Sequence, residues 1–167
     1  MGNSLSNYTI IRVTPTLSTD AYADGDVLFT ATEIPNAVLG DRGCSKLVNC
    51  FVLDQARQSF SCDFVFTEEN TALGTINATA DISDANMEAI GLCGALRHES
   101  TVAALGGIDG VRINKPSSLS GVGESTDPML IQAKAGSTSV FVSGVITSGT
   151  PTFAADDLDI ILHIQYK

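Results

Sequence analysis

The sequence predicts an all-β protein with one short helix, folded as an antiparallel β-sandwich of about eight or nine strands, with a jelly-roll arrangement as one option. Three observations support this fold class. Apolar and polar side chains alternate along several short stretches, residues typical of turns separate those stretches, and helix-start signals are clear at one place. Neighbouring side chains on a strand point to opposite faces, so alternation indicates one buried face. Such strands are typical of antiparallel sheets, because parallel sheets are covered on both faces.

The alternation is clearest over residues 157–167. Every second side chain there is apolar, and the intervening side chains are polar except Ile161. The expected buried set is Leu158, Ile160, Leu162, Ile164 and Tyr166. Asp159 and His163 fall on the opposite face, which we expect to meet water. This strand should therefore tie the last residues of the chain into the core.

The first half of the chain predicts four more strands, at residues 8–13, 26–32, 46–53 and 59–67. Residues 46–53 are apolar on both faces, which indicates a central strand. In residues 59–67 the apolar side chains again recur at every second position. They are Phe60, Cys62, Phe64 and Phe66. Because a short connection separates 46–53 from 59–67, we expect these two strands to form a hairpin.

One helix is predicted, from Asp84 to Ile90. Ser83 is a suitable N-cap, because its hydroxyl can accept a hydrogen bond from a backbone N–H of the first turn. Asp84 adds a negative charge where the helix dipole favours one. Gly91 can adopt the left-handed conformation that ends many helices.

The second half of the chain is less regular. Residues 95–105 suit a helix or a strand, and we choose a strand because Ser100, Thr101 and Val102 are followed by a Gly-Gly turn. Further strands are expected at 111–113, 129–134 and 140–147. A long polar loop at 116–128 and a flexible N-terminal arm at 1–7 complete a predicted single domain, 1–167.

The composition argues against two kinds of partner. The chain has 19 acidic and 9 basic residues, a formal net charge of −10, which repels the phosphates of a nucleic acid. No apolar stretch approaches the roughly 18 residues needed to cross a membrane. Charged residues make up only 17% of the chain. The neutral, hydroxyl-rich surface that this implies is common in β-domains that pack into assemblies.

The cysteines predict buried thiols rather than a metal site. The four are Cys44, Cys50, Cys62 and Cys93. Neither they nor the two histidines have the spacing of a zinc site. Cys62 is in register with three phenylalanines, so we expect a small apolar thiol on a core face. Disulfides are the less favoured alternative, since a reducing site of synthesis keeps thiols free.

A search for chemistry predicts no catalytic, cofactor-binding or metal-binding residue and no cofactor. The acidic clusters Glu68–Glu69 and Asp156–Asp159 lie at strand ends, where solvated turns are common. A glycosidase would instead need two carboxylates facing one cleft. His98 and His163 are both expected at the surface.

Calcium binding is left open at the acidic loop that contains Asp20, Asp24 and Asp26. Oxygen-rich loops can hold calcium, but the spacing of an EF-hand is not met. The alternative is a turn in which Asp24 and Gly25 provide the bend.

Three stretches resemble a known group of proteins: residues 25–38, residues 63–66 leading through 73–75 to 82–86, and residues 148–153 before the final strand. Together they resemble small β-rich virion structural proteins of tailed bacteriophages, of the capsid decoration or cement kind. The similarity covers roughly residues 22–92 and 136–166. The chain departs from it at Cys44, Cys50 and Cys93 and in the loop 116–128.

This resemblance implies a non-enzymatic subunit present in many copies. The first hypothesis is a decoration or cement protein on the outer head surface. It would be a homotrimer bound to the major capsid protein, located in the virion and assembled in the cytoplasm of the bacterial host. A tail, baseplate or fibre-type host-binding component is the alternative. A third hypothesis, a small glycan hydrolase or lyase, predicts a cleft with two converging carboxylates.

Overall fold

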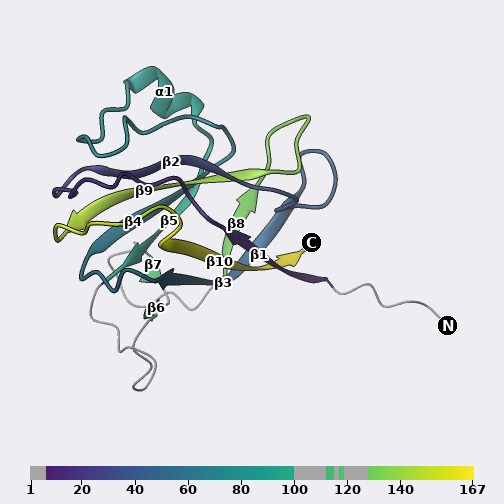
Figure 1. The fold of residues 1–167 in the computed structure, drawn as a ribbon. Helices are drawn as coiled ribbons and strands as arrows, with labels where there is room; N and C mark the ends of the chain where they lie inside the picture. Colours follow the sequence, from purple (N-terminus) through teal and green to yellow (C-terminus); the bar gives the residue numbers. More distant parts are fainter. Residues whose placement is uncertain (1–6, 100–111, 115–116, 119–127) are drawn as a thin grey trace.

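The computed structural model describes residues 7–99, 112–114, 117–118 and 128–167, which form ten strands and one helix in two antiparallel sheets (Figure 1). The strands are β1 (Tyr8–Val13), β2 (Val27–Ile34), β3 (Cys44–Asp54), β4 (Ser61–Thr67), β5 (Leu92–His98), β6 (Arg112–Asn114), β7 (Ser117–Ser118), β8 (Met129–Gln132), β9 (Val140–Ser148) and β10 (Leu158–Tyr166). The helix is α1 (Asp84–Ala89). The predicted all-β sandwich with one short helix is confirmed.

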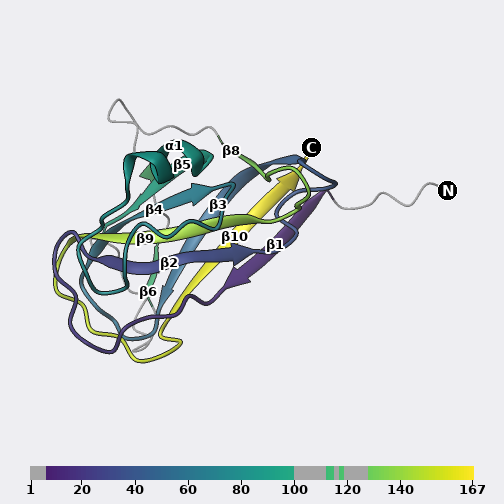
Figure 2. The same cartoon turned by 90° about the horizontal axis from the view of Figure 1, so that it is seen from above.

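Most strands of the first half of the chain pair with strands of the second half in reverse order. In the first sheet the order is β1-β10-β3, and both β6 and β8 pair with the far edge of β3. In the second sheet the order is β2-β9-β4-β5-β7. Thus β4 pairs with β5, β3 with β8, β2 with β9 and β1 with β10, as in an antiparallel ribbon rolled into two sheets. This is the topology of a jelly roll, with eight main strands and two short additions. Figure 2 shows strands of the second sheet crossing those of the first at an angle.

The predicted hairpin between residues 46–53 and 59–67 is wrong. β3 belongs to the first sheet and β4 to the second, so the connection between them crosses from one sheet to the other. Residues 55–60 can span roughly 20 Å, and packed sheets lie about 10 Å apart, so this connection is long enough to cross. β10, far away in the sequence, takes the place beside β3 instead.

The core lies between the sheets and contains the predicted alternating sets. Phe60, Cys62, Phe64 and Phe66 are all buried, as are Leu158, Ile160, Leu162 and Ile164. Tyr166 is half-buried at the end of its strand, where its hydroxyl donates to the Asn36 carbonyl at 2.9 Å. The sandwich is thus held by the inward faces of β4 and β10, one from each sheet.

β2 departs from simple alternation. Leu28 and Phe29 are consecutive, yet both belong to the main core, and the pairing with β9 shifts register twice along β2. Val27 joins a small outer cluster instead. Irregular pairing of this kind is how β-bulges re-aim side chains on an edge strand.

Residues 68–91, here named the covering segment, connect β4 to β5 and carry α1 on the outer side of the second sheet (Figure 1). Ser83 caps the helix as predicted, accepting from the Asn86 N–H at 3.3 Å, and Gly91 has a φ of +62°. Ile90 and Leu73 pack with Val27 beneath the segment. The covering segment therefore shields part of one outer sheet face.

Several sequence predictions reach beyond the described residues. Of the predicted strand 95–105, residues 95–98 lie in β5, whereas residues 100–105 lie outside the described residues. Most of the predicted loop 116–128 also lies outside them, although Ser117 and Ser118 pair with β5 as β7. Residues 1–6 of the predicted arm are likewise not described. Asn7 already belongs to the sheet, because its carbonyl accepts from the Tyr166 N–H at 2.7 Å.

Gly144 of β9 lies between Phe29 of β2 and Phe64 of β4. It pairs with Phe29 on one side and Phe64 on the other, and the ring centroids lie 6.0 Å apart. A Cβ at position 144 would lie 2.6 Å from Cε1 of Phe29. Glycine is therefore required by the close approach of the ring.

We predict that Gly144→Ala lowers the free energy of unfolding by about 1–3 kcal/mol, because the added methyl group overpacks the core. Urea denaturation measures the change. Phe29→Leu should relieve part of the clash, so the double variant should lose less than the sum of the two single losses. Additive losses would show that the ring of Phe29 is not what excludes a side chain at position 144.

Candidate functional surface

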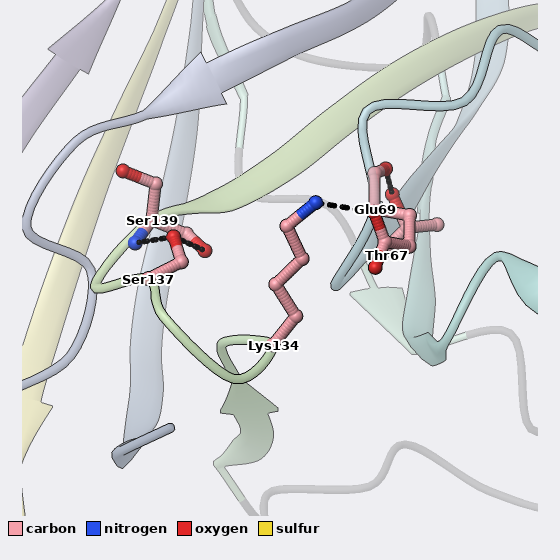
Figure 3. A network of polar contacts seen from close by, with 5 residues as sticks. All are labelled: Thr67, Glu69, Lys134, Ser137 and Ser139. Carbon is pink, nitrogen blue, oxygen red and sulfur yellow. Dashed lines mark hydrogen bonds and ion pairs between the residues drawn. The ribbon is translucent and has the colours of Figure 1, made fainter. Parts of the chain in front are cut away.

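The acidic clusters noted in the sequence are engaged in separate structural contacts. Lys134, just after β8, donates to Glu69 at 2.6 Å, while the Thr67 hydroxyl donates to the Glu69 carbonyl at 2.9 Å (Figure 3). Asp157 accepts from the Ala154 N–H at 2.6 Å within a turn. Glu69 and Asp157 therefore each have a separate local structural role.

A second set of contacts in Figure 3 fixes the turn before β9. The Ser137 hydroxyl accepts from the Ser139 N–H at 2.9 Å, as Figure 3 shows. The Ser139 hydroxyl also donates to Glu33 of β2 at 2.6 Å. These contacts hold the turn against the edge of the second sheet. They stabilise the strand connection.

The acidic loop at residues 20–26 is a turn. Gly25 has a φ of +88°, and the Asp26 carboxylate accepts from the Ala23 N–H at 2.7 Å. Asp26 is buried, whereas Asp20 and Asp24 are exposed. No cluster of three or more His, Cys, Asp or Glu side chains suited to a metal occurs in the described part of the chain.

The two histidines differ in their surroundings. The prediction of a surface position is wrong for His98, which is only 5% exposed and packs against Phe60 and Phe64 with centroid distances of 4.7 and 6.3 Å. It is the last residue of β5, and alternation directs its side chain into the sandwich. His163 lies on the outer face of β10 as predicted, where its ring contacts Phe51 edge-on at 5.3 Å.

All four cysteines are free thiols in this structure. Cys62 lies in the core as predicted, and Cys50 is buried as well. Burial raises the pKa of Cys50 to about 12. Burial, followed by the charges of Asp63 and Cys50, raises the pKa of Cys62 well above its ordinary value. Thiols of this kind are poor nucleophiles.

We predict that a maleimide reagent labels exposed Cys44 rapidly in the native protein and labels Cys50 and Cys62 only after unfolding. The physical reason is that both buried thiols lack solvent access and are held in the unreactive protonated form. Mass spectrometry of digested protein gives the extent of labelling at each site. Fast native labelling of Cys62 would remove it from the core.

Asp159 carries a buried charge, although the alternation predicted that its side chain meets water. Alternation does put it on the outer face of β10, but it is only 1% exposed, so the expectation of a solvated carboxylate is wrong. Arg12 and Thr14 both donate hydrogen bonds to its two oxygens. These residues come from β1 and its end, so they reach over the carboxylate from the neighbouring strand.

The environment of Asp159 favours the ionised carboxylate. Burial alone would raise its pKa, but the hydrogen bonds from Arg12 and Thr14 and the positive charge of Arg12 outweigh it, and the pKa is lowered. Arg12 is largely exposed and forms the rim of the contact. This ion pair therefore links β1 to β10 and leaves no net charge there.

We predict that the pH dependence of stability includes a contribution from Asp159. Because the folded pKa lies below the unfolded value of about 3.9, the contribution is present above that value and is lost as the pH falls through the folded pKa. Asp159→Asn should therefore lower stability at pH 7 more than at pH 3. Denaturation at both pH values, with exposed Asp24→Asn as the control, measures this. Equal losses at the two pH values would contradict the assignment.

The outer face of the first sheet carries apolar side chains among polar ones such as Asn49, His163 and Gln165. We call the outward side chains of β1, β10 and β3 the outer apolar face. Its apolar members are Tyr8, Ile10, Phe51, Leu53 and Ile161. Ile10 is 67% exposed and Tyr8 59%. No helix or strand among the described residues packs on this face (Figure 1).

The two outer faces of the sandwich are therefore unlike. On the second sheet, Val65 and Val145 point outward but are covered by the covering segment through Leu73, Ile82 and Ile90. Further along, Asp63 and Arg97 form a two-bond ion pair at 2.7 and 2.8 Å. Each outer face thus carries an ion pair, but among the described residues only the second sheet is shielded by a covering segment.

The outer apolar face also differs in charge from the rest of this acidic chain. Its charged strand residues are Arg12, Lys46 and Asp159, two bases against one acid, and Asp159 is paired with Arg12. A surface that is not negative can approach another protein without like-charge repulsion. The sequence contained the signal, since residues 46–53 are apolar on both faces, but it was interpreted only as a central strand.

The comparisons give no relative: no family model, no curated protein and no solved structure matches this chain. In the described part of the chain, no helix has the length and apolar character needed to cross a membrane.

Proposed function

We propose that this chain is a non-enzymatic structural subunit of a bacteriophage virion, a decoration or cement protein that binds the major capsid protein on the outer surface of the head. The observation that carries the proposal is the outer apolar face, which includes Phe51 and Ile161 and is not covered by the described elements. Contiguous exposed apolar surface is characteristic of interaction sites. The resemblance of three stretches to virion structural proteins supplies the class of partner.

The polar groups of the described residues support a binding role over catalysis. Glu69 is paired with Lys134 and Asp159 with Arg12, and these two ion pairs belong to different strands and connections. A hydrolase would need carboxylates that converge on one cleft. The contacts found here instead stabilise strands and turns.

The size of the outer apolar face bears on how it would bind. β10 has nine residues, so the face is about 30 Å long, and three strands make it about 15 Å wide. Roughly 450 Å² per copy is less than the approximately 800 Å² per partner of a stable interface. A single copy would therefore bind weakly through this face alone, and several linked copies would bind far more tightly.

We predict that the purified protein co-sediments with capsids stripped of it, and that binding survives moderate salt because the contact is apolar. Ile161→Glu should weaken binding by roughly tenfold or more, since it buries a charge in the contact. Leu92→Glu is the matched control. Leu92 is 61% exposed on β5 of the second sheet, so this change adds the same charge elsewhere.

The outcomes separate the candidate functions. Equal binding by the two folded variants would mean that the outer apolar face is not the contact. Retention on isolated tails but not on capsids would favour the tail or baseplate alternative. Degradation of a polysaccharide by the purified protein would overturn the non-enzymatic class.

A further inference from the structure

β1 is a long sheet edge with regular geometry. It stands at the end of the first sheet, and no other described strand pairs with its outer side. Its six residues pair with β10 in unbroken register from Tyr8 to Val13. An edge of this kind offers a row of backbone donors and acceptors to another strand.

The other edges differ from β1 in ways that limit pairing. β2, at the edge of the second sheet, shifts register twice, carries exposed Glu33 and ends immediately before Pro35. β6, β7 and β8 have three, two and four residues. Bulges, charges, prolines and short strands are the usual means of protecting an edge. β1 has no bulge and no proline, and its charge at Arg12 is neutralised by Asp159.

The hydrogen bonds between β1 and β10 show which backbone groups of β1 point toward the open edge. The Asn7 carbonyl accepts from the Tyr166 N–H, so position 7 bonds toward β10. In an antiparallel ladder bonded positions alternate, so positions 9, 11 and 13 also bond toward β10. The backbone N–H and C=O groups of Ile10 and Arg12 therefore point away from the sheet.

We propose that β1 pairs antiparallel with β1 of a second copy of this chain, about a two-fold axis at Ile10. In that register the two Ile10 residues bond to each other, and Tyr8 of one copy lies opposite Arg12 of the other. The exposed apolar side chains of Ile10 would meet, and the two arginines would be kept apart. The strand is thus complementary to itself, which an isologous contact requires.

Charge does not prevent a second copy from pairing with this edge. Each chain carries a net charge of −10, so two copies repel unless they meet where acidic groups are absent or paired. The described residues of β1 include no acid, and Arg12 is held by Asp159 of its own chain. The contact therefore brings the copies together at a locally neutral place.

The pairing would also join two outer apolar faces into one. Strands related by a two-fold axis perpendicular to a sheet keep the same face outward, so the joined face would measure roughly 900 Å². That value reaches the approximately 800 Å² per partner of a stable interface. This consequence rests on the proposed function, but the pairing itself does not. The dimer also differs from the homotrimer expected from the sequence.

Sedimentation equilibrium of the full chain, with Ile10→Lys, Ile10→Glu and their mixture, tests the proposal. Wild type should be a dimer, and each variant alone should be a monomer, because like charges would face each other at the axis. The one-to-one mixture should regain the dimer, since lysine then faces glutamate. Leu130→Lys is the matched control, because Leu130 is 54% exposed on β8 at the far edge of the same sheet and should leave the dimer intact.

Circular dichroism should show that both Ile10 variants fold, since the side chain is 67% exposed. A wild-type monomer or trimer would overturn the proposal. A dimer disrupted by Leu130→Lys would overturn it, and so would a mixture that stays monomeric. A wild-type dimer that fails to bind capsids would contradict the proposed function but support the β1 contact. A wild-type monomer that binds capsids would support the proposed function but contradict the β1 contact.

Discussion

β10 lies between β1 and β3, and this position organises both the core and the edges of the first sheet. Its inward side chains, Leu158 to Ile164, fill the centre of the core opposite the phenylalanines of β4. β10 lies on one side of β3 and β6 and β8 on the other, and the chain after β3 crosses to the second sheet. The same placement makes β1 the outermost strand of the first sheet, with its backbone groups directed outward.

The ion pair between Arg12 and Asp159 belongs to the same arrangement. It joins the end of β1 to the start of β10 and covers a carboxylate that would otherwise be buried without compensation. It also leaves no net charge on the part of the outer apolar face where β1 ends. One contact thus secures an edge strand and sets the electrostatic character of the surface beside it.

The two outer faces differ in how far they are covered, and this difference is the feature most relevant to the proposed function. The covering segment shields Val65 and Val145 on the second sheet, whereas Phe51 and Ile161 on the first sheet have no comparable cover among the described elements. A sandwich needs only its inner faces to be apolar. Apolar residues on one outer face are thus not required by the fold itself, and we relate them to the proposed attachment to a larger assembly.

Local sequence patterns were enough to predict the fold class, most strand positions, the helix cap at Ser83 and the buried face that includes Cys62 and Leu162. These follow from local alternation and capping, which act over a few residues. The pairing of β3 with β10, the burial of His98 and the position of Asp159 beneath Arg12 could be seen only in the folded structure. Each depends on residues far apart in the chain. Strand periodicity says which side chains share a face, but which strand lies beside that face is set by how the whole ribbon rolls up.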